Sequence, residues 1–300
     1  MVDFIQHIYF SILETLHGTY TLQILTNFFE LVWTIAPYFI IAVFIHVGLN
    51  YLIRRKKVSL TIRNEYLGIV AAALLGALSP LPTYAAVPIA LSFIGSGLRL
   101  SVAMSFLIAS PLINPSIFFL TASLLGLRIA LVRLFLSIFI AIIGGIALKL
   151  IRLHVELSKS IATKKEGDRT IFVDVYRTTL FLGKYFVIAL LLSAAVRALL
   201  PADYISRLLG QNVSMSLLVA IALGVPFYSC GGAAIPLIEV LMEKGMSDAA
   251  VIAFFIAGPA TKLETVYIYR SMLGSKILIF YLILTCFGAY LGGVMMYYLF

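Results

Sequence analysis

The chain has 300 residues, of which 62% are hydrophobic and only 12% are charged. A soluble domain has about 45–50% apolar and about 25% charged residues, so this composition excludes an ordinary soluble enzyme. The net charge is +9, but the basic residues gather in short connections, which excludes the continuous basic surface of a nucleic-acid-binding domain. Apolar stretches long enough to cross a bilayer recur throughout, and they predict an all-α polytopic membrane protein.

The first half of the chain divides into four predicted parts. A membrane span at 28–52 is followed by a proline-broken stretch at 66–97, a segment at 100–126 interrupted by "SPLINP", and a span at 128–150. The broken stretch is too short for two full crossings of about 20 residues each. Its prolines argue against one straight helix.

The second half repeats these four parts, at about 176–199, 214–245, 248–274 and 276–299. The predicted organisation is therefore an N-terminal membrane repeat at 1–150, a basic cytoplasmic loop at 151–175 and a C-terminal membrane repeat at 176–300.

An internal duplication supports this division. Shifting the chain by 148 residues aligns 76–126 with 224–274 without a gap. Prolines and glycines fix backbone breaks, so their coincidence indicates that the pattern of breaks is repeated. The matched residues include Gly76 and Gly224, Pro88 and Pro236, Gly97 and Gly245, Pro111 and Pro259, and Gly126 and Gly274.

The basic residues predict the topology. They follow the first span at 54–63 and surround the central loop at 149–177, and short basic loops share the cytoplasmic side. Both loops are cytoplasmic if 66–97 is a re-entrant helical hairpin that enters and leaves by one face. Each half then has three spans plus one hairpin, an eight-helix type, and the halves are inverted relative to each other. The alternative is two parallel repeats that together make eight full spans.

The predicted helix breaks have a functional meaning. Broken backbone at membrane depth is tolerated only inside protein or beside a water-filled cavity. Inverted repeats with discontinuous helices are typical of secondary transporters, whose substrate sites lie near the midplane. The residues expected to mark the breaks are Pro80, Pro82, Pro88, Pro111, Pro115, Pro226, Pro236 and Pro259.

Two charges follow the break at Pro259. The duplication places Lys262 opposite Asn114, and Glu264 opposite Ser116. A charge at the bilayer centre costs about 2.5–3.5 kcal/mol on insertion scales, so both should face the protein interior. Residues two apart do not share a helix face, so we expect Lys262 to point to a central cavity and Glu264 to find a different partner. The alternative for Lys262 is a structural clamp on free carbonyls.

The candidate site is assembled from polar residues at the breaks. For the hydroxyls, ordinary hydrogen bonding to broken backbone is an equal alternative, and Glu239 could simply mark a wet helix face. The candidate substrate-binding residues are Ser79, Thr83, Tyr84, Asn114, Tyr228, Ser229, Cys230, Thr261 and Lys262, and the candidate coupling residues are Glu264 and Glu239.

Two segments carry a family resemblance. "GSGLRLSVAMSFLIASPLINPSIFFLTASLLG" and "GVPFYSCGGAAIPLIEVLMEKGMSDAAVIAFFIAGPATK" resemble the first-half and second-half signatures of the bacterial permease family that includes YraQ and the organoarsenical efflux permease ArsP. The resemblance implies an inner-membrane permease with an intramembrane substrate route. Members of that family often carry cysteines in the first-half hairpin, where this chain has "SPLPTYAAVP", so only Cys230 falls on a matching position.

The sequence thus predicts a secondary transporter of the inner membrane, not an enzyme, that exports a small amphipathic or anionic solute such as an organoarsenical. Proton coupling is expected; a cofactor, a metal site and a nucleic-acid partner are not, because no phosphate-binding, ligand or catalytic motif is present. A homodimer is left open. The alternatives are a lipid-headgroup or metal-ion permease, or a membrane scaffold that docks a soluble partner through the loop at 152–170.

Overall fold

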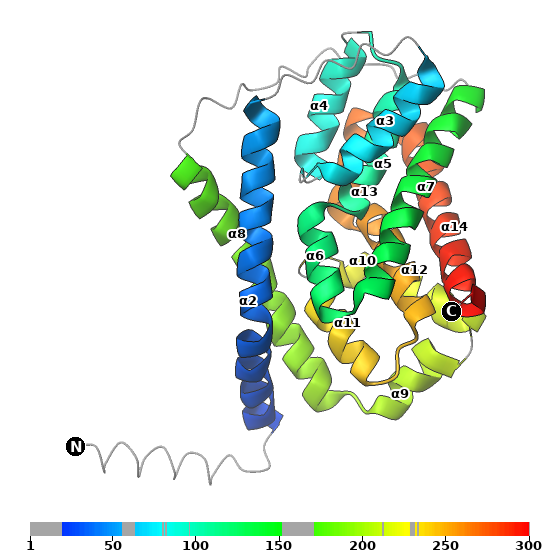
Figure 1. Ribbon diagram of the computed structural model, residues 1–300. Helices are drawn as coiled ribbons and strands as arrows, with labels where there is room; N and C mark the ends of the chain where they lie inside the picture. Colours follow the sequence, from blue (N-terminus) through cyan, green and yellow to red (C-terminus); the bar gives the residue numbers. More distant parts are fainter. Residues whose placement is uncertain are drawn as a thin grey trace.

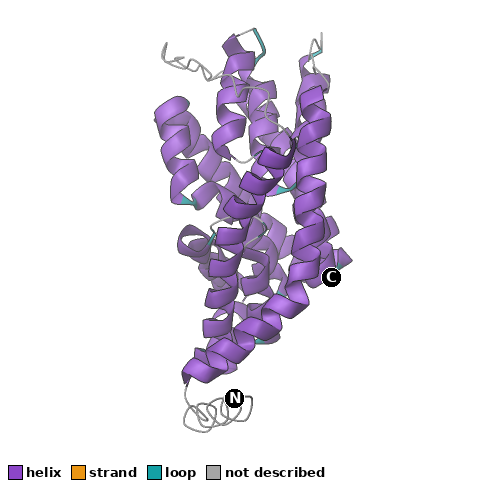
Figure 2. Cartoon of the chain, turned by 90° about the vertical axis from the view of Figure 1, so that its left-hand side faces the viewer, coloured by secondary structure: helices purple, strands orange, loops and turns teal. Residues whose placement is uncertain are grey.

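The fold is entirely helical within the residues that the structure describes. The structure is a computed structural model, and it describes residues 20–55, 64–79, 81, 83–95, 97–151, 171–211, 213–228, 232 and 234–299. Within these ranges every regular element is a helix (Figures 1 and 2). Four helical segments are long and apolar enough to cross a membrane, and up to six if each bent pair forms one span. The predicted all-α, multi-pass class is confirmed at this level.

The helices follow the predicted order in both halves. The first half contains α2 (Tyr20–Arg55), α3 (Glu65–Leu78), α4 (Thr83–Gly95), α5 (Leu100–Leu112), α6 (Pro115–Leu124) and α7 (Leu127–Ile151). The second half contains α8 (Ile171–Leu199), α10 (Val213–Phe227), α11 (Ala234–Glu243), α12 (Asp248–Thr261), α13 (Leu263–Met272) and α14 (Ser275–Leu299).

A short insertion in the second half was not predicted. Helix α9 (Ala202–Ser206) and a turn of π-helix, η1 (Arg207–Gln211), follow α8 after a bend of 106°. The predicted central loop at 151–175 lies mostly outside the described residues.

The duplication seen in the sequence recurs in the backbone. Four glycines have positive φ angles, at 97° for Gly97, 95° for Gly126, 99° for Gly245 and 89° for Gly274. They form two pairs, each separated by the same 148-residue shift, and each precedes an equivalent helix: α5 and α12, or α7 and α14. A left-handed backbone favours glycine, which explains why these positions match so clearly in the sequence.

Helices α2 and α8 pack antiparallel, side by side (Figure 1). Near one end Arg197 Nη1 lies 3.4 Å from Glu30 Oε2, and farther along the rings of Phe39 and Phe186 stack with centroids 3.9 Å apart. Residue numbers rise along α2 while they fall along α8, so these equivalent helices run in opposite directions.

Helices α7 and α14 are a second antiparallel pair of equivalent helices. A Cβ at Gly288 would lie 2.7 Å from Ile140 Cδ1, and a Cβ at Gly292 would lie 2.7 Å from Leu136 Cδ1. The glycines therefore let the two helices approach closely. Opposite directions of equivalent helices are what inverted repeats require, whereas the orientation of each half across a membrane stays a prediction.

The two hairpins lie at opposite ends of the molecule, with α3 and α4 towards the top of Figure 1 and α10 and α11 towards the bottom. Helices α3 and α4 have 14 and 13 residues, which span only about 20 Å each at 1.5 Å per residue. Equivalent glycines make equivalent crossings: a Cβ at Gly76 would lie 2.6 Å from Phe106 O on α5, and one at Gly224 would lie 3.0 Å from Gly258 Cα on α12. Helix α12, buried from Ala249 to Ala260, forms the centre of the core.

Candidate functional site

The helix breaks lie shortly after the prolines rather than at them. Pro111 lies inside α5 and Pro259 inside α12, and the helices end one and two residues later. Helix α6 then begins at Pro115, the first helical position, where the missing N–H costs nothing. The bend between α12 and α13 is 43°.

Pro111 can sit inside α5 because its lost hydrogen bond is replaced from the other half. A proline has no N–H, so the carbonyl of Leu107, four residues earlier, has no donor in its own helix. The buried hydroxyl of Tyr269, on α13, donates to this carbonyl at 3.2 Å. The two halves are therefore joined at the backbone defect that the proline creates.

The other prolines differ in their positions. Pro88, Pro226 and Pro236 lie within α4, α10 and α11, so these helices continue through residues that were expected to break them. Pro236 is the third residue of α11, where a backbone N–H has no acceptor within the helix. Pro80 and Pro82 lie outside the described residues, between the end of α3 and the start of α4.

Lys262 forms the junction between α12 and α13. Its backbone is extended, with φ −60° and ψ 138°, and it ends one helix and begins the next. Lys262 Nζ lies 3.2 Å from Glu264 Oε2, so the expectation that these two charges do not pair is wrong. The rule that separates residues two apart holds inside a helix, and Lys262 is not helical. The Lys262 side chain is 15% exposed and that of Glu264 is 46% exposed.

Asn114 occupies the equivalent junction before α6. Its side-chain oxygen accepts a hydrogen bond from the backbone N–H of Ile117 at 2.9 Å, so it caps the helix. Lys262 makes no such capping bond and pairs with Glu264 instead. Equivalent positions therefore perform different chemistry in the two halves, a neutral cap in one and an ion pair in the other.

Buried hydroxyls without a hydrogen-bond partner gather at the breaks of the described chain. Ser79 and Thr83 flank the turn between α3 and α4, while Ser116 and Thr265 lie in the first turns of α6 and α13. Leaving a buried hydroxyl without a hydrogen bond costs about 1–3 kcal/mol of stability. We therefore expect a polar ligand or a water molecule beside each one. Two of the predicted binding residues, Ser79 and Thr83, belong to this group.

The remaining predicted residues are placed as follows. The Thr261 hydroxyl donates to Ala257 O at 3.1 Å and is thus used by its own helix. The buried ring of Tyr228 packs against Gly258 and lies 5.8 Å from the ring of Phe254.

Glu239 lies half-buried on α11, and its Oε2 atom is buried without a hydrogen-bond partner. The side chain of Tyr84 and the residues Ser229 and Cys230 lie outside what the structure describes. The roles predicted for all these residues stay predictions.

Arg133, on α7, is a fully buried charge that the sequence reasoning missed. Its Nε donates to Leu112 O at 3.2 Å, and its Nη1 donates to Thr121 Oγ1 at 3.1 Å. Its guanidinium carbon lies 4.1 Å from the ring centroid of Phe255, a cation–π contact. The signal was available, because a charge inside the predicted span at 128–150 marks a functional candidate.

The equivalents of these residues are aromatic. The 148-residue shift relates Arg133 to Tyr281, and Thr121 to Tyr269. The rings of Tyr281 and Tyr269 stack with centroids 4.4 Å apart and planes 16° from parallel. In the first half, Arg133 thus joins α7 to α6 with a cation. In the second half, Tyr281 joins α14 to α13 through stacked rings.

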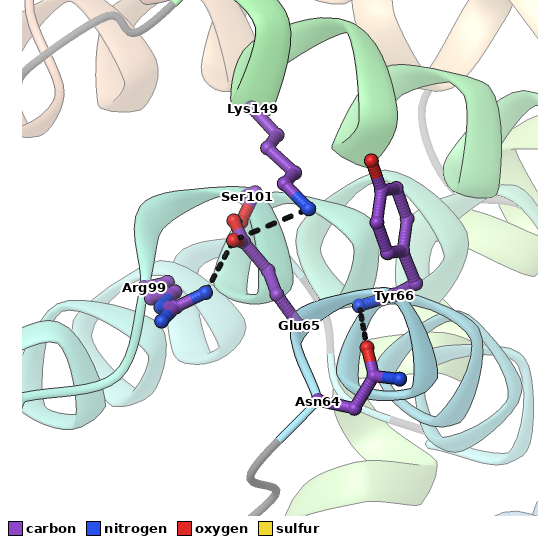
Figure 3. Close-up of polar contacts among 6 residues, drawn as sticks. All are labelled: Asn64, Glu65, Tyr66, Arg99, Ser101 and Lys149. Carbon is purple, nitrogen blue, oxygen red and sulfur yellow. Dashed lines mark hydrogen bonds and ion pairs between the residues drawn. The ribbon is translucent and has the colours of Figure 1, made fainter.

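A polar cluster links the start of α3 to the start of α5 and to α7 (Figure 3). Glu65, the first residue of α3, accepts hydrogen bonds from Arg99 and from Ser101 Oγ, the latter at 2.6 Å, and lies 3.6 Å from Lys149 Nζ. Lys149 also lies 3.3 Å from the ring centroid of Tyr66. Burial raises the pKa of Glu65, but the hydrogen bonds and the two cations outweigh it, so the pKa is lowered.

Comparison with known proteins identifies the family of the chain. The sequence matches the ArsP_1 family, described as "Predicted permease", over residues 21–298. The chain belongs to this family. The protein named UPF0718 protein MJ0584, from Methanocaldococcus jannaschii, is 21% identical over 77% of this chain and 83% of its own length. No solved structure matches the chain.

Membership of the ArsP_1 family confirms the resemblance seen in the sequence. It supports a membrane transporter rather than an enzyme, and together with the apolar helices it supports a multi-pass membrane protein. Within this permease fold, the junctions at Asn114 and Lys262, the buried hydroxyls and Arg133 are the candidate functional residues.

Proposed function

We propose that this chain is a secondary transporter of the bacterial cytoplasmic membrane that exports a small amphipathic or anionic solute, such as an organoarsenical, by alternating access. Its two halves would be inverted repeats whose broken helices enclose a polar site near the midplane. Family membership supports the transporter class. The observation that carries the mechanism is an asymmetry between equivalent helices.

The α2–α8 pair packs against one set of helices but not against the equivalent set in the other half. Helix α2 packs against α6 and helix α8 packs against α11, and α6 and α11 also pack against each other. Their equivalents, α13 and α4, likewise pack against each other, but among the described residues no comparable packing joins them to α2 or α8. Among the described residues, the α2–α8 pair therefore covers α6 of the first half and the hairpin helix α11 of the second half, but not their equivalents α13 and α4.

The side chains show the same asymmetry. Ser116 on α6 is buried, whereas its equivalent Glu264 on α13 is exposed. Glu264 pairs with Lys262 yet stays exposed, and an exposed carboxylate at membrane depth faces water rather than lipid, because its insertion is costly. We therefore take the α13 side to be open to water and the α6 side to be closed in this conformation.

The open side lies at the end of the molecule where the predicted cytoplasmic loops begin. In Figure 1, α4 and α13 lie towards the end at which α2 and α7 finish, and the basic segments at 54–63 and 149–177 follow those two helices. Basic loops favour the cytoplasm, so this conformation would face inwards. If α2 and α8 moved to cover α13 instead of α6, the α6 side would then open to the opposite side of the membrane.

Transport into everted membrane vesicles tests the proposal. The panel should include trivalent methylarsenic, a pentavalent methylarsonate and simple organic anions, each with and without a pH gradient. We expect uptake of at least one solute to depend on the chain and to be lost in Lys262→Ala, with the amount of folded protein unchanged. Failure to transport any member of the panel would count against a transporter and favour a scaffold that works through its 152–170 loop.

A further inference from the structure

The positive charge of Arg133 has no negative partner among the described residues. A guanidinium stays charged at any physiological pH. All the contacts of Arg133 named above are with neutral groups: a carbonyl, a hydroxyl and an aromatic ring. The ion pairs found in the described chain involve other cations. A buried charge without a counter-charge is unfavourable, which makes Arg133 a ready partner for an anion.

One end of this guanidinium is available for a ligand. The side chain has five N–H donors arranged in a planar fork. Nε and Nη1 have partners, but Nη2 is buried and makes no hydrogen bond. The side chain of Tyr228, the residue that directly follows α10, interacts with this guanidinium. An incoming group would therefore meet a donor from α7 beside the side chain of Tyr228.

A purely structural role does not require the charge. Arg133 does tie α7 to the carbonyl of Leu112, where α5 ends. At the equivalent position, however, Tyr281 joins the last long helix to Tyr269 by stacking, without any charge. Neutral residues are thus enough to join these two helices in the second half. The positive charge of Arg133 in the first half needs a different explanation.

Charge balance selects Arg133 over Lys262 as the anion partner. Lys262 is paired with Glu264, so that junction is close to neutral. Arg133 leaves one uncompensated positive charge behind the closed α6 side. A guanidinium binds carboxylates, phosphates and similar oxyanions through two parallel hydrogen bonds.

We propose that Arg133 binds the solute directly and that the transported solute carries an oxyanion group, such as a carboxylate, phosphate or arsonate. This inference rests on the proposed transport function and names the chemical class of its substrate. Nη2 would donate to the oxyanion, beside the side chain of Tyr228. A lipid phosphate offers the same chemistry as a free oxyanion, so the experiment separates the two sources.

Thermal unfolding of the purified chain in phosphatidylcholine nanodiscs tests the inference. Sodium acetate, phosphate and methylarsonate are compared with sodium chloride at equal ionic strength. We expect at least one oxyanion to raise Tm in a dose-dependent manner and the rise to vanish in Arg133→Gln. Arg133→Lys keeps the charge but loses the fork, and should need about tenfold more oxyanion for half of the effect.

Arg128→Gln is the matched control, because it removes the same charge from an exposed position on α7. It should keep the full response. The inference is overturned if no oxyanion stabilises the wild type beyond chloride, or if Arg133→Gln and Arg128→Gln respond alike. If Arg133→Gln does not fold, Thr121→Val provides a second variant: it removes the Nη1 partner, keeps the charge and should retain the oxyanion response, and loss of that response would contradict direct binding by Arg133.

Two further arms locate the source and separate the two proposals. Stabilisation by phosphatidylglycerol nanodiscs that disappears in Arg133→Gln would assign the site to a lipid phosphate, whereas stabilisation by dissolved salts assigns it to a free solute. Transport of neutral solutes alone, unaffected by Arg133→Lys, would overturn this inference and leave the transporter intact. Oxyanion stabilisation through Arg133 without transport of any solute would support anion binding by Arg133 and count against the proposed transport function.

Discussion

The hydroxyl of Tyr269 donates a hydrogen bond to the carbonyl of Leu107 at 3.2 Å, and this bond joins α13 of the second half to α5 of the first. The carbonyl is free because Pro111, four residues later, has no N–H to donate. A backbone defect in one repeat is thus satisfied by a side chain from the other. The pairing explains how a proline-containing helix can lie largely inside the core.

Tyr269→Phe should destabilise the chain by about 1–3 kcal/mol, because it leaves the Leu107 carbonyl buried without a donor. The ring stacking with Tyr281 is retained, so the change isolates the hydroxyl. Pro111→Ala supplies the missing N–H and should recover part of this loss in the double variant. Unfolding in nanodiscs measures all four proteins; simple additivity of the two substitutions would show that the hydroxyl does not serve this carbonyl.

Stability should fall at acidic pH through Glu65. Because its pKa is lowered in the folded chain, its stabilising contribution is complete above the unfolded value of about 4.3 and is lost as the pH falls through the lower folded value. Glu65→Gln should therefore be less stable at neutral pH and show a flatter profile below about pH 4.3. Unfolding measured from about one pH unit below the unfolded pKa up to neutrality checks this, and parallel profiles for the two proteins would refute it.

The crossing glycines should tolerate no side chain. A Cβ at Gly76 would approach Phe106 O to 2.6 Å and one at Gly224 would approach Gly258 Cα to 3.0 Å, and both are backbone atoms that cannot simply rotate away. Alanine at either position should destabilise by about 1–3 kcal/mol. Gly183→Ala on α8 is the control: its Cβ would meet nothing within 4 Å, so it should be neutral or stabilising. Equal effects at the three positions would mean that the crossings are not tight.

The ion pair at the second junction should matter for transport rather than for folding. Lys262→Ala removes a charge that ends α12 and begins α13, where it makes no capping bond. We expect transport to be lost while the melting temperature changes little, because Glu264 is 46% exposed and remains hydrated. Asn114→Ala, at the equivalent neutral cap, should instead cost about 1 kcal/mol of stability. A Lys262→Ala protein with normal transport would remove this residue from the mechanism.

The duplication made most of the fold predictable from sequence. Paired glycines such as Gly97 and Gly245 need a left-handed backbone, so they marked the helix ends within a few residues. The insertion of α9 and η1 has no described counterpart in the first half, so the comparison of repeats could not find it. Prolines were less reliable guides, since Pro111 lies inside a helix and the carbonyl that it leaves without a donor, Leu107 O, is bonded by a side chain 162 residues away from Leu107.

The candidate site was predictable only in part. Ser79 and Thr83 were predicted as binding residues because they flank a proline-rich turn. The structure places both hydroxyls in buried positions without partners, and their role in binding stays a prediction. The pairing of Lys262 with Glu264 was missed because the segment was treated as helical. Arg133 was missed because its duplicate is a tyrosine and no proline or glycine lies beside it. Its burial depends on α5, α6 and α12 meeting around it, which local sequence does not reveal.

The central claim is that α6 and α13 are equivalent helices that face opposite sides of the membrane in turn. Thiol labelling tests it most directly, with Ser116→Cys and Glu264→Cys each placed in a chain whose Cys230 and Cys286 have been replaced. A membrane-impermeant reagent is applied to right-side-out and to inverted vesicles under transport conditions. The account predicts that position 264 reacts from the cytoplasmic side and position 116 from the opposite side. Reaction of both positions from the same side would contradict it.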